Sequence, residues 1–251
     1  MSWSTDFIGK SFTINEFSSY VKYAKMEWSP SGVTIHHTAE PSLAQRPTDF
    51  TSQHMLNLKD FYKNEKGWST GPHLFIDRKH IWVFMSITNR GIHARSFNKS
   101  HLGVEMLGDY DNETPNKDVI YLTYVATSLL LKKIGRTTAS VNFHRDDPLT
   151  TKSCPGVKVS KSWFIPGLVA VFNDSHINDV KVHIVKNNIS LPIHSYIKKG
   201  QSITTAPLSE LEVQLLHKRS TVDDHEVGVA SFLKVNDIPF NWDSKTKTIN
   251  L

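Results

Sequence analysis

The chain has 251 residues, enough for one large domain or for a medium domain joined to a small one. Hydrophobic residues make up 39% and charged residues 21%, as in an ordinary globular protein, and no stretch approaches the roughly 18 uncharged apolar residues that span a bilayer. The net charge of +5 suits an anionic partner, but no run of five or more basic residues occurs. We therefore expect no nucleic-acid partner and no membrane insertion.

The single cysteine, Cys154, excludes an internal disulfide framework. The first ten residues contain no basic segment that leads into an apolar one, so we expect no signal peptide. On that ground we expect the protein to be made in a cytoplasm and to remain there at first. The sequence indicates no oligomeric state.

The N-terminal third predicts an arm, a strand and a helix. Residues 1–30 carry several apolar positions and predict a short N-terminal arm or helix that packs on the domain. Residues 32–36 are β-rich and short, which is typical of a buried strand. After a polar loop at 38–48, residues 48–66 show helical spacing, and Thr48 is the expected cap of that helix.

Strands and helices then alternate along the chain. The predicted elements are a hairpin of residues 74–77 and 81–84, a strand at 102–107, a helix at 117–134, a strand at 141–143 and a closing helix at 163–172. Gly135 ends the longest helix, and the closing helix contains Pro166. This alternation predicts an α/β layer fold with a mostly single central sheet.

The pattern changes after about Asn173. Strand-like alternation is expected at 180–185, 189–197 and 231–251, turns at 186–188 and 242–245, and a short helix at 208–216. We predict two domains, a catalytic domain at 1–173 and a small β-rich C-terminal module at 175–251.

Three residues that lie far apart in the sequence could form one zinc site. His36 ends a predicted strand, His144 follows another, and Cys154 lies in a loop rich in proline and threonine. A thiolate with two imidazoles suits zinc, and three protein ligands leave the fourth position for water, as in hydrolases. Asp146 and Asp147 are rival ligands in the same loop, with turn residues as the alternative. A single cysteine with histidine also fits a thiol hydrolase.

Several blocks of sequence occur in the order expected of one enzyme family. Gly32-Val-Thr-Ile-His36-His37-Thr-Ala39 resembles the opening metal strand of the zinc-dependent type 2 N-acetylmuramoyl-L-alanine amidases. That family includes the peptidoglycan recognition proteins and the phage lysozyme-type amidases. The further blocks are Gly71 to Asp77, His93 to Gly108 and His144 to Gly156. The resemblance covers residues 20–170 and implies a central mixed β-sheet flanked by helices.

The resemblance implies a role for each matched residue. His36, His144 and Cys154 would hold Zn²⁺, although some relatives have aspartate in place of the cysteine. His37 would point to the opposite face of its strand, because neighbouring side chains alternate. Lys152 matches a lysine that stabilises negative charge on the attacked carbonyl oxygen.

Proton transfer is assigned to Glu105, which matches the catalytic glutamate of the cytoplasmic recycling amidases. The phage branch uses a tyrosine on the central strand, whose place here is taken by Pro72, and proline cannot transfer protons. His93 and Asn98 match positions near the substrate and are assigned to substrate contact, with hydrogen bonding within a loop as the alternative. His73 is assigned to substrate binding as an accessory group, with a buried core histidine as its alternative.

The substrate implied by the family is bacterial peptidoglycan, at the amide between N-acetylmuramic acid and L-alanine. We interpret the chain as a phage endolysin that leaves the cytoplasm of the host for its cell wall. The alternatives are a non-catalytic peptidoglycan-binding module and an intracellular recycling amidase. Residues 240–249 are similar to small repeats named after the N-terminal domain of copper amine oxidases. They favour a wall-anchoring module, with a stabilising or dimerising appendage as its alternative.

Overall fold

The structure, a computed structural model, divides the chain into two compact units, Met1–Asp174 and Ser175–Leu251. The described residues are 3–173, 180–186, 189–190, 195–197, 204–207, 226–229, 233, 238, 240–243 and 248–251. The helix predicted at 208–216 lies outside them, as do the residues of the predicted turns at 187–188 and 244–245.

The first unit is built on a six-stranded sheet with the order β1-β4-β3-β5-β2-β6. Its strands are β1 (Phe7–Phe12), β2 (Gly32–His37), β3 (Leu74–Ile76), β4 (Ile81–Met85), β5 (His101–Met106) and β6 (Val141–Phe143). The neighbours of β2 and β5 run parallel to them, whereas β4 pairs antiparallel with both β3 and β1. The predicted central mixed sheet is confirmed.

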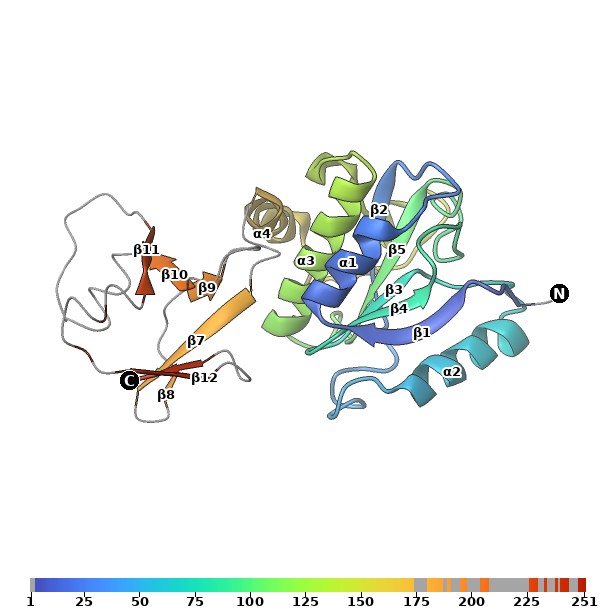
Figure 1. Ribbon diagram of the computed structural model, residues 1–251. Coiled ribbons are helices and arrows are strands. Elements are labelled where there is room, and N and C mark those ends of the chain that lie inside the picture. The colour runs from blue at the N-terminus through green and yellow to red at the C-terminus, as the bar shows by residue number, and fades with distance from the viewer. Residues whose placement is uncertain are drawn as a thin grey trace. The chain divides into compact units, whose positions relative to one another are not determined.

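Helices lie on both sides of this sheet. Its α-helices are α1 (Ile14–Tyr23), α2 (Ser52–Asp60), α3 (Lys117–Lys133) and α4 (Lys161–Asn173). The shorter turns are η1 (Phe61–Glu65), a π-helix that continues α2, and the 3₁₀ segments η2 (Thr138–Ser140) and η3 (His144–Asp146). Helix α3 contacts α1, α4 and the two central strands, while α2 lies at the other side, next to β1 (Figure 1).

The two faces of the central strands differ in character because side chains alternate along a strand. One face presents Val33, Ile35 and Val104, all fully buried, where the central strands meet α3. The opposite face carries His36 and Glu105, which are register partners on β2 and β5. The sheet therefore provides an apolar core on one side and a polar site on the other.

The expectations about the N-terminal region were right in part. The predicted helix that packs on the domain is α1, whose Phe17 and Val21 are buried and which contacts α3. Residues 7–12 form the edge strand β1, not an arm or helix; the register shifts between Phe7 and Lys10, and Gly9 has a φ of +61°. This bulge breaks the two-residue alternation by which a strand is recognised. The helix expected from Thr48 begins three residues later, because Thr51 accepts a hydrogen bond from the backbone N–H of His54.

The second unit is β-rich, as predicted. Its strands are β7 (Val180–Lys186), β8 (Ile189–Ser190), β9 (Ser195–Ile197), β10 (Thr204–Pro207), β11 (Glu226–Gly228), β12 (Asn241–Asp243) and β13 (Thr248–Asn250). Trp242 and Asp243, which were predicted to lie in a turn, instead belong to β12 and pair with β13. Ile184, Val229, Leu233 and Ile249 are buried in this unit.

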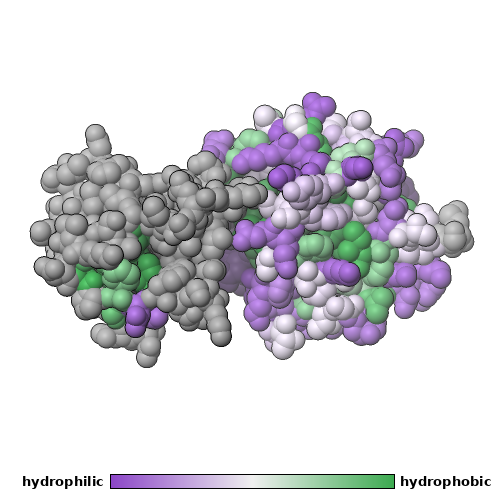
Figure 2. All heavy atoms as spheres, viewed as in Figure 1, coloured by the Kyte–Doolittle hydropathy of each residue, from purple (hydrophilic) through white to green (hydrophobic). Residues whose placement is uncertain are grey.

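Within the described residues, no helix has the length and apolar character needed to cross a membrane. On the face shown in Figure 2, hydrophilic residues predominate over the first unit, and hydrophobic residues lie interspersed among them.

Candidate metal centre

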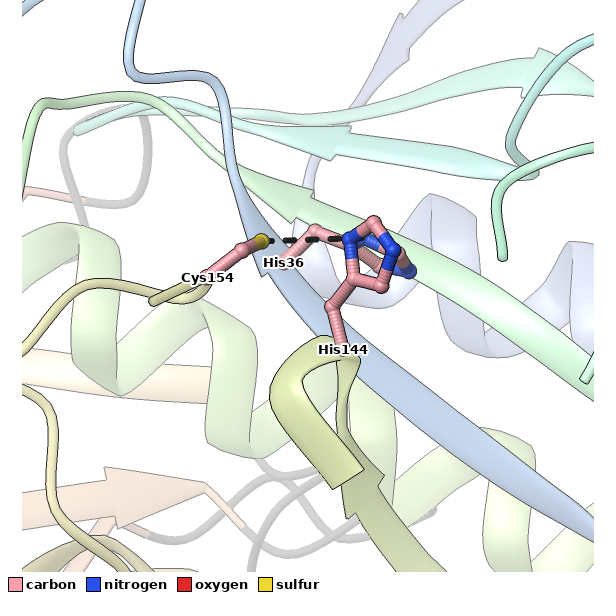
Figure 3. Close-up of side chains that lie close together, drawn as sticks. All are labelled: His36, His144 and Cys154. Atoms are coloured by element: carbon pink, nitrogen blue, oxygen red, sulfur yellow. Dashed lines mark hydrogen bonds between the residues drawn. The ribbon is translucent and has the colours of Figure 1, made fainter. Parts of the chain in front are cut away.

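The fold brings His36, His144 and Cys154 together at the end of two neighbouring strands. His36 is near the end of β2, and His144 follows β6 directly, one residue beyond the register pair Ile35 and Phe143. Cys154 enters from the loop that follows (Figure 3). Nδ1 of His36 lies 3.1 Å from Nδ1 of His144 and 3.8 Å from Sγ of Cys154. All three donor atoms lie within 4.8 Å of one another.

These separations fit a zinc ion. Two nitrogens bound to one tetrahedral zinc at 2.0–2.1 Å lie about 3.3 Å apart, and a nitrogen and a sulfur about 3.6 Å apart. The observed 3.1 Å and 3.8 Å are close to both values. Among the described residues, no fourth histidine, cysteine or acidic side chain joins the group. Three ligands of this kind match the donor count of catalytic zinc sites.

The protonation of the donors also suits a metal more than a free thiol nucleophile. Burial, with the neighbouring imidazoles, holds the pKa of His36 well below its usual value, and burial also lowers the pKa of His144. Both rings are therefore neutral and keep a lone pair at neutral pH. Burial raises the pKa of Cys154 far above that of an exposed thiol. A thiol hydrolase needs a depressed thiol pKa, whereas a bound metal deprotonates the thiol directly.

Backbone groups of β2 support the sulfur. The N–H of His37 donates to Sγ of Cys154 at 3.4 Å, a contact that stabilises a thiolate. The side chain of His37 lies on the other face of the strand, as alternation predicts, and its Nδ1 accepts a hydrogen bond from the N–H of Tyr110 at 3.0 Å. His37 thus contributes its backbone to the site and its ring to the core.

Glu105 lies beside the three donors. Its Oε1 is 3.7 Å from Nδ1 of His36, and only 12% of its side chain is exposed. Burial raises the pKa of Glu105 to about 8, and the charge of Lys152 opposes this shift. A carboxyl group with a pKa near neutrality can both accept and donate a proton under working conditions.

Lys152 is exposed on the loop that carries Cys154. Its positive charge acts on the pKa values of His36, His144, Cys154 and Glu105, which places its ammonium group within electrostatic reach of all four. A cation held at this edge is available to an anionic oxygen of a bound molecule.

The acidic residues of the loop between His144 and Cys154 have other partners. Asp146 accepts a hydrogen bond from the N–H of Phe143 and forms an ion pair with Lys161 at 2.6 Å. Asp147 is buried and accepts from the N–H and hydroxyl of Ser96 at 2.9 Å and 2.6 Å. These contacts hold the loop in place, and neither aspartate is in the donor group.

Substrate contact stays a prediction for His73, His93 and Asn98. In the structure, each of these residues forms hydrogen bonds within the protein. His73 is fully buried; its Nδ1 accepts from the N–H of Gly103 and its Nε2 donates to the carbonyl of Asn89. Oδ1 of Asn98 accepts from the N–H groups of His93 and Ala94 at 2.7 Å and 2.8 Å.

His93 contacts the candidate metal ligand His36, a contact that was not predicted from the sequence. Nδ1 of His93 lies 3.0 Å from Nε2 of His36. The sequence holds one signal of such a contact, because Gly103 interrupts an apolar strand. In the structure, a Cβ at residue 103 would lie 2.6 Å from Cγ of His93. A glycine inside a strand marks the close approach of another group.

The aromatic residues near the site are packed against other side chains. Trp82 is buried and its Nε1 donates to Asp77, while Trp68 stacks on Tyr62 with ring centroids 5.0 Å apart. Tyr62, on the π-helix η1, is a neighbour of Glu105 that the sequence did not indicate. Burial, with the charge of Glu105, raises the pKa of its hydroxyl well above the usual value.

Comparison with known proteins points to one family. Peptidoglycan-recognition protein SD of Drosophila simulans is 31% identical over 97 residues, which cover 38% of this chain and 51% of that protein. The match thus spans about half the length of this relative. Among solved structures, one match is a mutant of Drosophila PGRP-LB in complex with tracheal cytotoxin, with 23% sequence identity and a TM-score of 0.47. This match covers 55% of the present chain and 83% of the PGRP-LB chain.

Another match is the endolysin amidase LysCS of Clostridium intestinale URNW, with 20% sequence identity and a TM-score of 0.47. This match covers 67% of the present chain and 91% of the LysCS chain. The sequence model of the N-acetylmuramoyl-L-alanine amidases matches residues 26–157, just over half of the chain, and this span contains all three donor residues. The chain is thus a member of the N-acetylmuramoyl-L-alanine amidase family.

Proposed function

We propose that the chain is a zinc-dependent N-acetylmuramoyl-L-alanine amidase that hydrolyses bacterial peptidoglycan. The observation that carries this proposal is the convergence of His36, His144 and Cys154 to within 4.8 Å, with Glu105 alongside. Family membership supplies the substrate class, and the three-donor group supports the reaction type.

The chain's own residues account for the proton and charge movements of amide hydrolysis. His36, His144 and Cys154 would hold a zinc ion, which supplies Lewis acidity for water activation and carbonyl polarisation. Glu105 accepts the proton that the attacking water loses and then gives it to the leaving amine nitrogen. The ammonium group of Lys152 stabilises the negative charge that develops on the carbonyl oxygen.

The test is to incubate the full chain with purified walls and to identify which bond is cut. Release of free L-alanine N-termini, without new reducing sugar ends, is the expected result. The variant His144→Ala should release none while it still folds. Binding to walls without release of N-termini would support the alternative of a non-catalytic peptidoglycan-binding module. The Drosophila relative is named a peptidoglycan-recognition protein.

We further propose that the protein acts as a phage endolysin and that its second unit retains it on the wall. The support is the appended compact unit Ser175–Leu251, because a second binding site raises the local concentration of an enzyme at an insoluble substrate. A chain that lacks residues 175–251 should show weaker wall pull-down and slower lysis of intact walls. Unchanged retention would contradict the anchoring role.

A further inference from the structure

His93 contacts the ring nitrogen of His36 that is not in the donor group. Nδ1 of His93 lies 3.0 Å from Nε2 of His36, and Nε2 of His93 lies 3.0 Å from the backbone oxygen of His101. The two imidazoles are 2% and 6% exposed and meet edge to face, with centroids 5.1 Å apart and planes at 89°. The result is a buried series of hydrogen bonds that runs from a carbonyl group to a proposed metal ligand.

The direction of each hydrogen bond follows from its fixed end. A carbonyl oxygen only accepts, so Nε2 of His93 must carry a hydrogen. In a neutral imidazole the second nitrogen is then an acceptor, and Nδ1 of His93 receives a hydrogen from Nε2 of His36. His36 therefore has its hydrogen on Nε2, and its Nδ1 carries a free lone pair. That lone pair belongs to the atom that lies near His144 and Cys154.

We infer that His93 is a positioning residue that selects the tautomer of His36 able to bind the metal ion. A neutral histidine in water populates both tautomers, and the form with hydrogen on Nδ1 cannot use this nitrogen as a ligand. The second partner of a metal-binding histidine commonly fixes its tautomer and ring orientation, and here that partner is another histidine. This inference rests on the proposed function, because it concerns the same zinc site.

The neighbouring residues are arranged around the ring of His93. A Cβ at Gly103 would lie 2.6 Å from Cγ of His93, so the strand β5 has room for this ring only because residue 103 is glycine. Asn98 fixes the backbone on which His93 stands, through hydrogen bonds to the N–H groups of His93 and Ala94. The matched block from His93 to Glu105 thus supports His36 in addition to supplying Glu105.

The test measures zinc affinity in the full chain, by competition with a chromophoric chelator. His93→Ala should bind zinc about 10- to 100-fold more weakly than the unchanged protein. His93→Asn, whose amide oxygen can accept near the position of Nδ1, should recover part of this loss. His54→Gln is the matched control: it removes a histidine outside the site and keeps a side chain suited to the helix cap at Thr51, so zinc affinity should not change.

A second measurement needs no variant. Long-range ¹H–¹⁵N spectra of the zinc-loaded protein should show His36 with its hydrogen on Nε2, protected from exchange, and its Nδ1 as the metal-bound nitrogen. A hydrogen on Nδ1 of His36, or equal zinc affinity in His93→Ala and the unchanged protein, would overturn the inference and leave the zinc amidase proposal intact. Failure of the unchanged protein to bind zinc would overturn the proposed function itself.

Discussion

Glu105 and His36 are register partners on neighbouring parallel strands, and Oε1 of Glu105 lies 3.7 Å from Nδ1 of His36. Because partners in a parallel sheet project from the same face, the strand pairing alone brings a carboxyl group next to a proposed zinc ligand. The sheet therefore fixes the position of the proposed proton-transfer group, Glu105, relative to the donor atoms.

Replacement of Glu105 by glutamine should abolish proton transfer and leave the donor group in place. We expect a fall in kcat of about 10²- to 10⁴-fold, the usual contribution of a general acid–base residue, with zinc stoichiometry unchanged. Steady-state release of N-termini from soluble wall fragments gives kcat, and metal analysis gives the stoichiometry. Glu65→Gln, on the exposed side of η1, is the control and should keep full activity. Full activity in Glu105→Gln would remove this residue from the mechanism.

Removal of the Lys152 charge should affect both rate and pH dependence. Lys152→Ala should lower kcat by about 10²- to 10³-fold, the typical cost of losing one group that stabilises the developing oxyanion. Since the charge of Lys152 lowers the pKa of Glu105, its loss raises that pKa, and the acidic limb of the kcat/KM profile should move to higher pH.

Lys158→Ala is the matched control for this prediction, because Lys158 is an exposed lysine on the same loop that donates to the carbonyl of Asn112. It should change neither kcat nor the profile. An acidic limb that stays in place in Lys152→Ala would show that the two charges do not interact.

The residue at position 154 separates metal chemistry from thiol chemistry. Cys154→Asp keeps an anionic ligand and should retain part of the zinc binding and activity, whereas Cys154→Ala should lose most of both. Chelator competition and N-terminus release measure the two properties. Equal inactivity of both variants, with zinc still bound to Cys154→Asp, would favour a thiol nucleophile.

Buried histidines should make the first unit less stable in acid. Burial lowers the pKa of His73 to about 4 and that of His93 to about 3, while both return to about 6.5 on unfolding. A depressed folded pKa contributes stability above the unfolded value, which is lost as pH falls. The free energy of unfolding should therefore decline below pH 6.5, by about 1.4 kcal/mol per pH unit for each histidine, down to about pH 4.

Denaturant unfolding between pH 7 and pH 5 checks this slope, with chelator present so that zinc binding does not contribute. Tryptophan fluorescence reports mainly on the first unit, which holds five of the six tryptophans. His73→Gln should reduce the slope by the contribution of one histidine, about 1.4 kcal/mol per pH unit. An unchanged slope in this variant would show that His73 is charged in the folded protein.

Local patterns in the sequence were sufficient for most strands and helices of the first unit. Helix α3 was predictable because its apolar residues recur at helical spacing and Gly135, with a φ of +65°, follows its end. Alternation on β2 predicted that His36 and His37 lie on opposite faces. Strand β1 was missed because the bulge near Gly9 interrupts the alternation of buried and exposed side chains. The bulge is stabilised by the pairing of β1 with β4, and no local sequence pattern reveals that pairing.

The candidate site was predictable only in its outline. The donor residues could be identified from the matched blocks, since His36 lies near the end of one strand, His144 directly follows another, and Cys154 lies in the loop after it. The contact between His93 and His36 joins a loop to a strand 57 residues away. It depends on the space above Gly103, and only the assembled sheet defines that space.

We propose that His36, His144 and Cys154 hold one zinc ion on which amide hydrolysis depends. The most direct measurement removes metal from the full chain with a chelator, titrates zinc back and follows release of L-alanine N-termini from purified walls. We predict complete loss of activity and its recovery at one zinc per chain, with no effect of alkylating agents on the zinc-loaded protein. Activity that survives removal of all metal would show that hydrolysis does not depend on a zinc ion at these three residues.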